Sequence, residues 1–133
     1  MTGKVHYDLV SPERLLRSGE ADMVVVPGSD GDFGVLPGHA PVISTIRPGV
    51  IEVHEAGADS ERIFISGGVC EVSADRCTVL ADEAVAVGDL DRSDLEQRLK
   101  VAEADLVDAK TDDQAHHAAD AVVLLKDLLL VVR

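Results

Sequence analysis

Aromatic side chains are almost absent from this chain of 133 residues. It has no tryptophan, and its only aromatic residues are Tyr7, Phe33 and Phe64. Apolar residues still make up 46% of the sequence. That is enough for the packed core of one domain, or of one small domain with an appendage. Because aromatics contribute so little of this apolar content, we expect a core built from valine, leucine, isoleucine and alanine.

Basic residues are also scarce, with 12 Lys and Arg against 25 Asp and Glu, a formal net charge of −13. Such a chain repels phosphate backbones and anionic lipid, so we expect no binding to nucleic acid. The partners should offer basic or neutral surfaces, although solubility alone explains the acidity equally well. No run of about 18 apolar residues exists, so no membrane insertion is expected. The longest apolar stretch, Ala121–Val132, is interrupted by Lys126 and Asp127.

The sequence has only two cysteines, Cys70 and Cys77, which make no disulfide framework and suit a reducing cytoplasm. Both occupy apolar positions, and we interpret them as small buried hydrophobes. The first residues, Met1–Tyr7, contain neither a long hydrophobic region nor an Arg- and Ser-rich pattern. We therefore expect the protein to stay where it is made.

Glycine and proline disappear after Gly88, which divides the chain into two parts. Residues 1–88 contain short apolar runs separated by turn residues such as Pro27-Gly28, Asp30-Gly31 and Gly67-Gly68. Short strands with frequent turn signals indicate an all-β sandwich or barrel. Examples of the strands that we expect are Val5–Val10, Met23–Val26, Val50–Val53, Arg62–Ile65 and Thr78–Leu80.

Residues 89–133 change to helical spacing. In each of two segments the apolar residues recur at intervals of three and four, which places them along one face of a helix of about 18 residues. These residues are Leu95, Leu99, Ala102, Leu106 and Ala109, then Ala115, Ala118, Val122, Leu125, Leu129 and Val132.

Capping signals and a short break complete this prediction. Ser93 and Glu96 fit a capping box at the first helix, and Asp112 and Asp113 can cap the second. The break around Lys110–Asp113 is short, which makes the helices antiparallel neighbours. The expected fold is an all-β sandwich N-terminal domain followed by a C-terminal antiparallel α-helical hairpin.

Several sequence motifs in residues 1–88 resemble those of the epsilon subunit of F-type ATP synthases of the bacterial type. They are Gly31–Pro41 (GDFGVLPGHAP), Arg47–Val50 (RPGV), Ser66–Val72 (SGGVCEV) and Thr78–Ala84 (TVLADEA). These motifs occur in the same order as in the family and at about the same spacing, across residues 4–88. The helical part matches the family in layout but much less in sequence.

The resemblance implies a ten-stranded β-sandwich with a helical hairpin, acting as a non-catalytic rotor subunit of the central stalk. The expected partners are the gamma subunit, the polar loops of the c-ring and, through an opened hairpin, the alpha and beta subunits. The subunit would couple c-ring rotation to gamma and thus to ATP synthesis. It would need no cofactor and would lie peripherally on the cytoplasmic face of the bacterial plasma membrane.

The same resemblance implies an interface at Asp32, Phe33, Pro37, Gly38 and His39. It places the turn around Asp32, which lies between two glycines, at the end of the sandwich that faces the rotor ring. An ordinary turn aspartate is the alternative interpretation of Asp32. His39 is expected to serve in structure or at the interface, because no catalytic or metal partners are evident for it.

The family's ATP-sensing motif, I/L-D-x-x-R-A, is degenerate here. The matching positions read Leu90–Leu95, with Asp94 in place of the arginine. Because an aspartate repels phosphate, Asp91, Arg92 and Asp94 make at most a weakened nucleotide site. The second helix is acidic, whereas inhibitory relatives use basic residues there, so we expect weak intrinsic inhibition of ATP hydrolysis.

A stand-alone β-sandwich ligand-binding protein, or a small enzyme with a helical lid, is the alternative function. The sequence offers no assembled set of nucleophile and base to support it. No metal site is expected either, since the adjacent His116 and His117 point about 100° apart on a helix.

Overall fold

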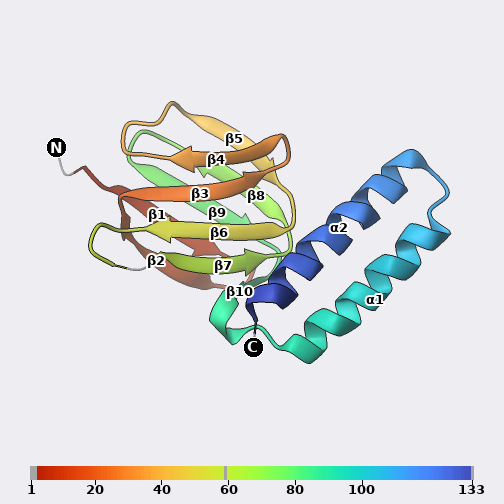
Figure 1. Ribbon diagram of the computed structural model, residues 1–133. Helices are drawn as coiled ribbons and strands as arrows, with labels where there is room; N and C mark the ends of the chain where they lie inside the picture. The colour runs from red at the N-terminus through yellow and green to blue at the C-terminus, as the bar shows by residue number, and fades with distance from the viewer. Residues whose placement is uncertain (1–2, 59, 133) are drawn as a thin grey trace. The chain divides into compact units, whose positions relative to one another are not determined.

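The computed structural model describes residues 3–58 and 60–132 and divides into two compact units, Met1–Ala86 and Val87–Arg133 (Figure 1). The first unit is made of strands and the second of helices, which confirms the predicted fold class. The described strands are β1 (Val5–Val10), β2 (Leu15–Ala21), β3 (Met23–Gly28), β4 (Gly31–Val35), β5 (Val42–Ile46), β6 (Gly49–His54), β7 (Glu61–Ile65), β8 (Gly68–Val72), β9 (Arg76–Ala81) and β10 (Ala84–Ala86).

The strands form two facing layers. They are hydrogen-bonded in the order β10-β7-β6-β3-β5-β8-β9-β1-β2, and β4 pairs with the other side of β3. Strands β3 and β5 share only the residue pair Gly28–Ile46. The sheet therefore folds over at this point into one layer of β4, β3, β6, β7 and β10 and another of β5, β8, β9, β1 and β2 (Figure 1). The pairing of β1 with β9 is parallel, and the other described pairings are antiparallel.

Aliphatic side chains fill the space between the layers, as the scarcity of aromatics predicts. In β1 and β6 buried residues alternate strictly with partly exposed ones, which is the period-two pattern of strands with one covered face. Tyr7 is the aromatic member of the buried cluster, and its ring lies over Gly19 on the neighbouring strand. The cluster consists of Val5, Tyr7, Leu9, Ala21, Val24, Val26, Val35, Ile46, Ile51, Val53, Ile63, Ile65, Cys70, Val72, Cys77, Val79 and Ala81.

The five strands given as examples all exist, and the described residues form ten strands, as the resemblance implies. Strands β2, β4, β5, β8 and β10 have mostly exposed or partly exposed residues, so their apolar pattern is weak. The turn residues Pro27-Gly28 and Asp30-Gly31 belong to a single tight hairpin, with the turn itself at Ser29 and Asp30. Pro27 and Gly28 are buried at the end of β3, and Gly31 begins β4.

Gly68 is required by a close approach of two strands. Its φ is 150°, and a Cβ atom added there would lie 1.9 Å from the backbone oxygen of Leu80. No side chain tolerates that distance. Gly68 is therefore required in the Ser66–Val72 motif so that β8 can pair closely with β9.

The second unit contains a short 3-10 turn, Val87–Asp89, and two helices, α1 (Arg92–Asp108) and α2 (Asp112–Val131). The predicted caps were wrong by one to two residues. Asp91 caps α1, because its carboxylate accepts a hydrogen bond from the Ser93 N–H, and Thr111 caps α2 through the Gln114 N–H at 3.1 Å. Asp112 and Asp113 lie in the first turn of α2 instead, where their negative charges interact favourably with the positive N-terminal end of the helix dipole.

The two helices are joined by Ala109–Thr111 and pack against each other along their length. Contacts between the first residue of α1 and the last residues of α2 show that they run antiparallel. Ala102 and Ala118 are buried at positions where a small side chain permits close packing of helices. Among the described residues, neither helix is long and apolar enough to cross a bilayer.

Candidate functional site

The surfaces predicted to bind partners lie on the β unit. Asp32 was expected in a turn between two glycines, and that local prediction was wrong. The turn is formed by Ser29 and Asp30, and Asp32 is the second residue of β4, opposite Pro27. Its side chain is 61% exposed, so it remains available to a partner.

Arg47 holds Asp32, a relationship that the sequence analysis missed. One guanidinium nitrogen of Arg47 lies 2.5 Å from Asp32 Oδ1, and the other donates to the carbonyl of Gly28 at 2.5 Å. The arginine follows β5 and thereby joins the two layers at the position where β3 passes to β5. The charge that this end of the sandwich presents is thus an ion pair, not a lone carboxylate.

Phe33 packs against the buried cluster rather than projecting fully from it. Its ring lies over Gly28, where an added Cβ would be 2.8 Å from a ring carbon. The side chain therefore fixes the β3–β4 hairpin, and only part of it is open to a partner.

Pro37, Gly38 and His39 lie at the other end of β4, in the loop before β5. Asp32 and Pro37 are five positions apart, about 16 Å in extended chain. The loop is fixed by a bond from the Gly38 N–H to the Ala74 carbonyl at 2.6 Å. His39 Nδ1 contacts the Ala40 carbonyl at 2.7 Å. The predicted interface residues thus form two separate sets at opposite ends of one strand.

An exposed apolar patch covers the outer face of β5, β8 and β9, and the sequence analysis missed it. Ile43 is 73% exposed, Leu80 50% and Val69 41%. Val69 lies directly opposite both Leu80 and Thr45 in the ladder, and Ile43 is two residues from Thr45 on the same face. Clustered apolar side chains on a rigid sheet are typical of a protein contact surface. We call Ile43, Val69 and Leu80 the outer patch.

A polar network lies on the outer face of β1, β2 and β9. Asp8 accepts hydrogen bonds from Ser18 at 2.8 Å and from Arg76 at 2.6 Å, and its carboxylate lies 3.1 Å from His6 Nε2. Burial by itself would raise the pKa of Asp8. The bonds from Ser18 and His6 and the charge of Arg76 outweigh it, so the pKa of this carboxyl lies below its ordinary value. The network joins three strands across the parallel β1–β9 pairing.

The positions of the degenerate nucleotide motif all have partners within the helical unit. Asp91 caps α1, and Arg92 donates to the Leu129 and Val132 carbonyls of α2 at 2.8 and 2.9 Å. Asp94 Oδ2 accepts from Arg98 Nε at 2.9 Å. Arg92 thus joins the two helices, whereas Asp91 and Asp94 stabilise the beginning of α1.

The sulfur atoms of Cys70 and Cys77 lie 3.6 Å apart between β8 and β9, and both residues are buried. Their burial confirms the prediction of small core hydrophobes. The contact with Cys70, together with burial, raises the pKa of the Cys77 thiol. This thiol therefore stays protonated and is a poor nucleophile.

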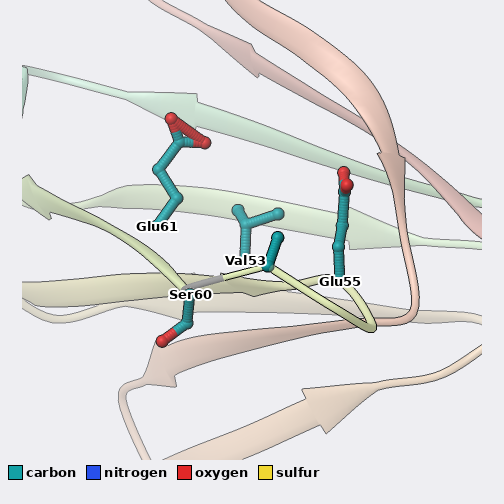
Figure 2. Close-up of a pocket in the computed structure, with 5 residues that line it drawn as sticks. Val53, Glu55, Ser60 and Glu61 are labelled. Carbon is teal, nitrogen blue, oxygen red and sulfur yellow. The ribbon is translucent and has the colours of Figure 1, made fainter.

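A shallow hollow of about 320 Å³ lies beside the β6–β7 hairpin, where Val53, Glu55, Ala58, Ser60 and Glu61 line it (Figure 2). Glu61 is engaged by an ion pair with Arg17 of β2. Across residues 3–58 and 60–132, no three His, Cys, Asp or Glu side chains are placed to hold a metal ion.

Comparison with known families decides the identity of this fold. The family described as ATP synthase, Delta/Epsilon chain, beta-sandwich domain matches residues 4–87. The ATP synthase epsilon chain of Parvibaculum lavamentivorans is 51% identical over 128 residues, which are 96% of this chain and 97% of the relative. That of Paramagnetospirillum magneticum is 46% identical over 132 residues, 99% of each chain.

The chain belongs to the ATP synthase epsilon chain family. This is a family of non-catalytic subunits, which agrees with the sequence-based expectation.

Chains of solved structures with low sequence identity share this fold. A chain in the mitochondrial ATP synthase of Euglena gracilis, in an assembly of OSCP, F1 and c-ring, has a TM-score of 0.77 at 21% identity. The match covers 96% of this chain and 81% of that one. A chain from the central stalk and c-ring of Tetrahymena thermophila mitochondrial ATP synthase has a TM-score of 0.62 at 13% identity, over 95% and 96% of the two chains.

Proposed function

We propose that this chain is a rotor subunit in the central stalk of a proton-translocating ATP synthase and that it links the gamma subunit to the c-ring. Family membership supports the proposal, as does the Tetrahymena structure, which is of a central stalk with its c-ring. In such a position the subunit carries torque, so it needs a rigid body and two contact surfaces. Its place would be peripheral, on the cytoplasmic face of the bacterial plasma membrane.

The outer patch is the observation that carries the contact with gamma. Ile43, Val69 and Leu80 stand on three adjacent strands with their inner faces packed in the core, so the patch moves as one body with the sandwich. Burying a large aliphatic side chain contributes roughly 1.5–3 kcal/mol. A gamma surface that covers these residues would therefore be held firmly.

The end of the sandwich near Asp32 is our candidate for the c-ring contact. Asp32 and Arg47 present an exposed ion pair there, which suits the polar loops of a ring rather than an apolar surface. Charges at a contact of this kind determine its register and specificity more than its affinity.

Weak intrinsic inhibition of ATP hydrolysis is the regulatory part of the proposal. The segment Asp112–Arg133 carries four aspartates against Lys126 and Arg133, a net charge of −2. An acidic helix gains little by rising toward an acidic segment of the beta subunit. Leu125 and Leu128 are buried in the closed unit, and exposing each would cost roughly 1.5–3 kcal/mol.

Co-purification of a fragment tests the assignment. Residues 1–88 contain the whole buried cluster and the outer patch, so a tagged fragment should bind gamma in a one-to-one ratio. It should also restore proton-driven ATP synthesis to membranes depleted of epsilon. Failure to bind gamma, by a fragment whose circular dichroism shows a folded β domain, would contradict the proposal. A free protein that carries a bound small molecule would support the alternative of a ligand-binding sandwich.

A further inference from the structure

Arg92 connects the beginning of α1 to the end of α2. One nitrogen of its guanidinium donates to the Leu129 carbonyl at 2.8 Å and to the Val132 carbonyl at 2.9 Å. Leu129 and Val132 are 37 and 40 positions from Arg92 in the sequence, and they meet it because the helices are antiparallel. Both bonds lie within the unit Val87–Arg133.

The carbonyls that Arg92 contacts belong to the last turn of α2 and to its C-cap residue. The cap bond of α2 runs from the Val132 N–H to the Leu128 carbonyl, and the final carbonyls of a helix take donors from outside the helix or from water. The end of α2 also carries the negative pole of the helix dipole, which favours a cation. The described span of α2 has no basic residue in its last turn. The cation comes from α1 instead.

We propose that Arg92 is a nucleotide-independent latch that holds the helical hairpin closed. The latch is the pair of hydrogen bonds from Arg92 to the carbonyls of Leu129 and Val132. It lies where the beginning of α1 and the end of α2 meet, farthest from the Ala109–Thr111 connection. At that position a single contact opposes separation with the longest lever arm. The consequence for ATP hydrolysis rests on the proposed function, but the latch itself does not.

The latch requires no nucleotide to hold the hairpin closed. Asp91 is engaged as the cap of α1, and Asp94 is paired with Arg98, so Arg92 is the cation of this segment nearest to the end of α2. A triphosphate that recruited the Arg92 nitrogen bonded to the Leu129 and Val132 carbonyls would have to displace them. Nucleotide would then loosen the hairpin, or leave it unchanged, and would not tighten it.

Hydrogen exchange of the full-length chain, followed by mass spectrometry, tests the latch. Arg92→Met keeps an unbranched apolar stem but removes all five donors. We expect exchange in residues 125–132 to become on the order of tenfold faster, because charge-assisted bonds to two carbonyls are lost. Peptides from the β strands should exchange as in the wild type. Arg92→Lys keeps the charge on a shorter side chain, which reaches the two carbonyls less well, and should give an intermediate rate.

Glu96→Gln is the matched control. Glu96 Oε1 lies 3.6 Å from the other Arg92 terminal nitrogen, one helical turn along α1, so this variant removes a neighbouring ion pair and leaves the latch. Wild-type exchange at the end of α2 in Glu96→Gln, with fast exchange in Arg92→Met, supports the proposal. Equal exchange in Arg92→Met and the wild type overturns it.

Two further outcomes are decisive. If Arg92→Met speeds exchange throughout the chain, the whole fold is disturbed, and Arg92→Lys is compared with the wild type instead. Wild-type protection of residues 125–132 in Arg92→Lys would then overturn the latch. In the second arm, magnesium ATP is added to the wild-type chain. Slower exchange at the end of α2 would overturn nucleotide independence, whereas unchanged or faster exchange supports it. Neither arm involves gamma, so failure of the proposed function and failure of the latch are distinguishable.

Discussion

The guanidinium of Arg47 lies 2.5 Å from the Asp32 carboxylate and also donates to the Gly28 carbonyl, which ties the β3–β4 hairpin to the segment between β5 and β6. Asp32→Arg should therefore lower coupling more than stability. An exposed ion pair contributes about 0–1 kcal/mol, so the free energy of unfolding in urea should fall by no more than about 1 kcal/mol. ATP-driven proton pumping by the reassembled enzyme should fall clearly.

The double variant Asp32→Arg with Arg47→Asp is its control, because it restores an ion pair of reversed polarity. It should recover stability but not pumping, because a c-ring loop that contacts this surface depends on the sign of the charge at each position. Normal pumping by Asp32→Arg alone would exclude the c-ring contact.

The outer patch predicts a localised loss of binding. Ile43→Asp and Leu80→Asp each place a charge where gamma should bury an apolar side chain, and each should weaken binding of gamma by roughly 10- to 100-fold. Leu15 is also exposed, on the edge strand β2, so Leu15→Asp should bind gamma normally. Surface plasmon resonance with immobilised gamma measures all three. Equal losses for the three variants would mean that the patch has no special role.

Gly68→Ala should be the most damaging single change in the β unit. The added Cβ would overlap the Leu80 backbone oxygen at 1.9 Å, and both atoms belong to paired strands that cannot move independently. We expect a loss of about 3 kcal/mol or more. Gly57→Ala separates this clash from backbone strain, because Gly57 also has a positive φ, of 80°, but no atom within 4 Å of the added Cβ. It should cost only about 1–2 kcal/mol. Thermal melts that rank the two variants equally would contradict the close approach.

The lowered pKa of Asp8 predicts an acid-dependent contribution to stability. A carboxyl whose pKa is lower in the folded state binds protons less readily there than in the unfolded chain. Its stabilisation is therefore complete above the unfolded pKa, about 3.9, and is lost as the pH falls through the folded value. The difference in unfolding free energy between wild type and Asp8→Asn should be present at about pH 5 and shrink below about pH 4. A difference that does not change with pH would show that the network makes no use of the charge.

Deletion of residues 112–133 tests the regulatory proposal. If the hairpin stays closed and inhibits weakly, F1-ATPase activity should remain nearly unchanged without α2. Removing the helix takes away its buried residues Ala118, Leu125 and Leu128, so binding of the truncated chain to F1 is measured in parallel. A several-fold rise in hydrolysis by complexes that retain the truncated chain would show that α2 inhibits.

Much of the fold was predictable because its determinants are local. The strict alternation of β1 and β6 comes from one covered face, and the spacing of three and four in α1 and α2 comes from their packing against each other. Helix ends were less predictable. Ser93 and Asp91 are both good caps, and only the conformation of the backbone determines which side chain reaches an unpaired N–H.

The candidate site was only partly predictable, because it depends on pairs of residues that are far apart in the sequence. The motifs around Asp32 and His39 identify the family, yet they gave no indication that Arg47 holds Asp32 or that Asp32 and Pro37 lie toward opposite ends of β4. The outer patch was missed because Ile43, Val69 and Leu80 come from three strands, two of which have weak patterns.

The sequence by itself determined the two-part organisation, the aliphatic core and the family, since each depends on residue types and on spacing along the chain. The tertiary structure decided the pairings: Arg47 with Asp32, Asp8 with Arg76, Gly68 against Leu80, and Arg92 with the end of α2. These contacts span 12 to 68 positions, and no local preference encodes them. They follow from strand register and helix direction, which are fixed only when the whole core is buried at once.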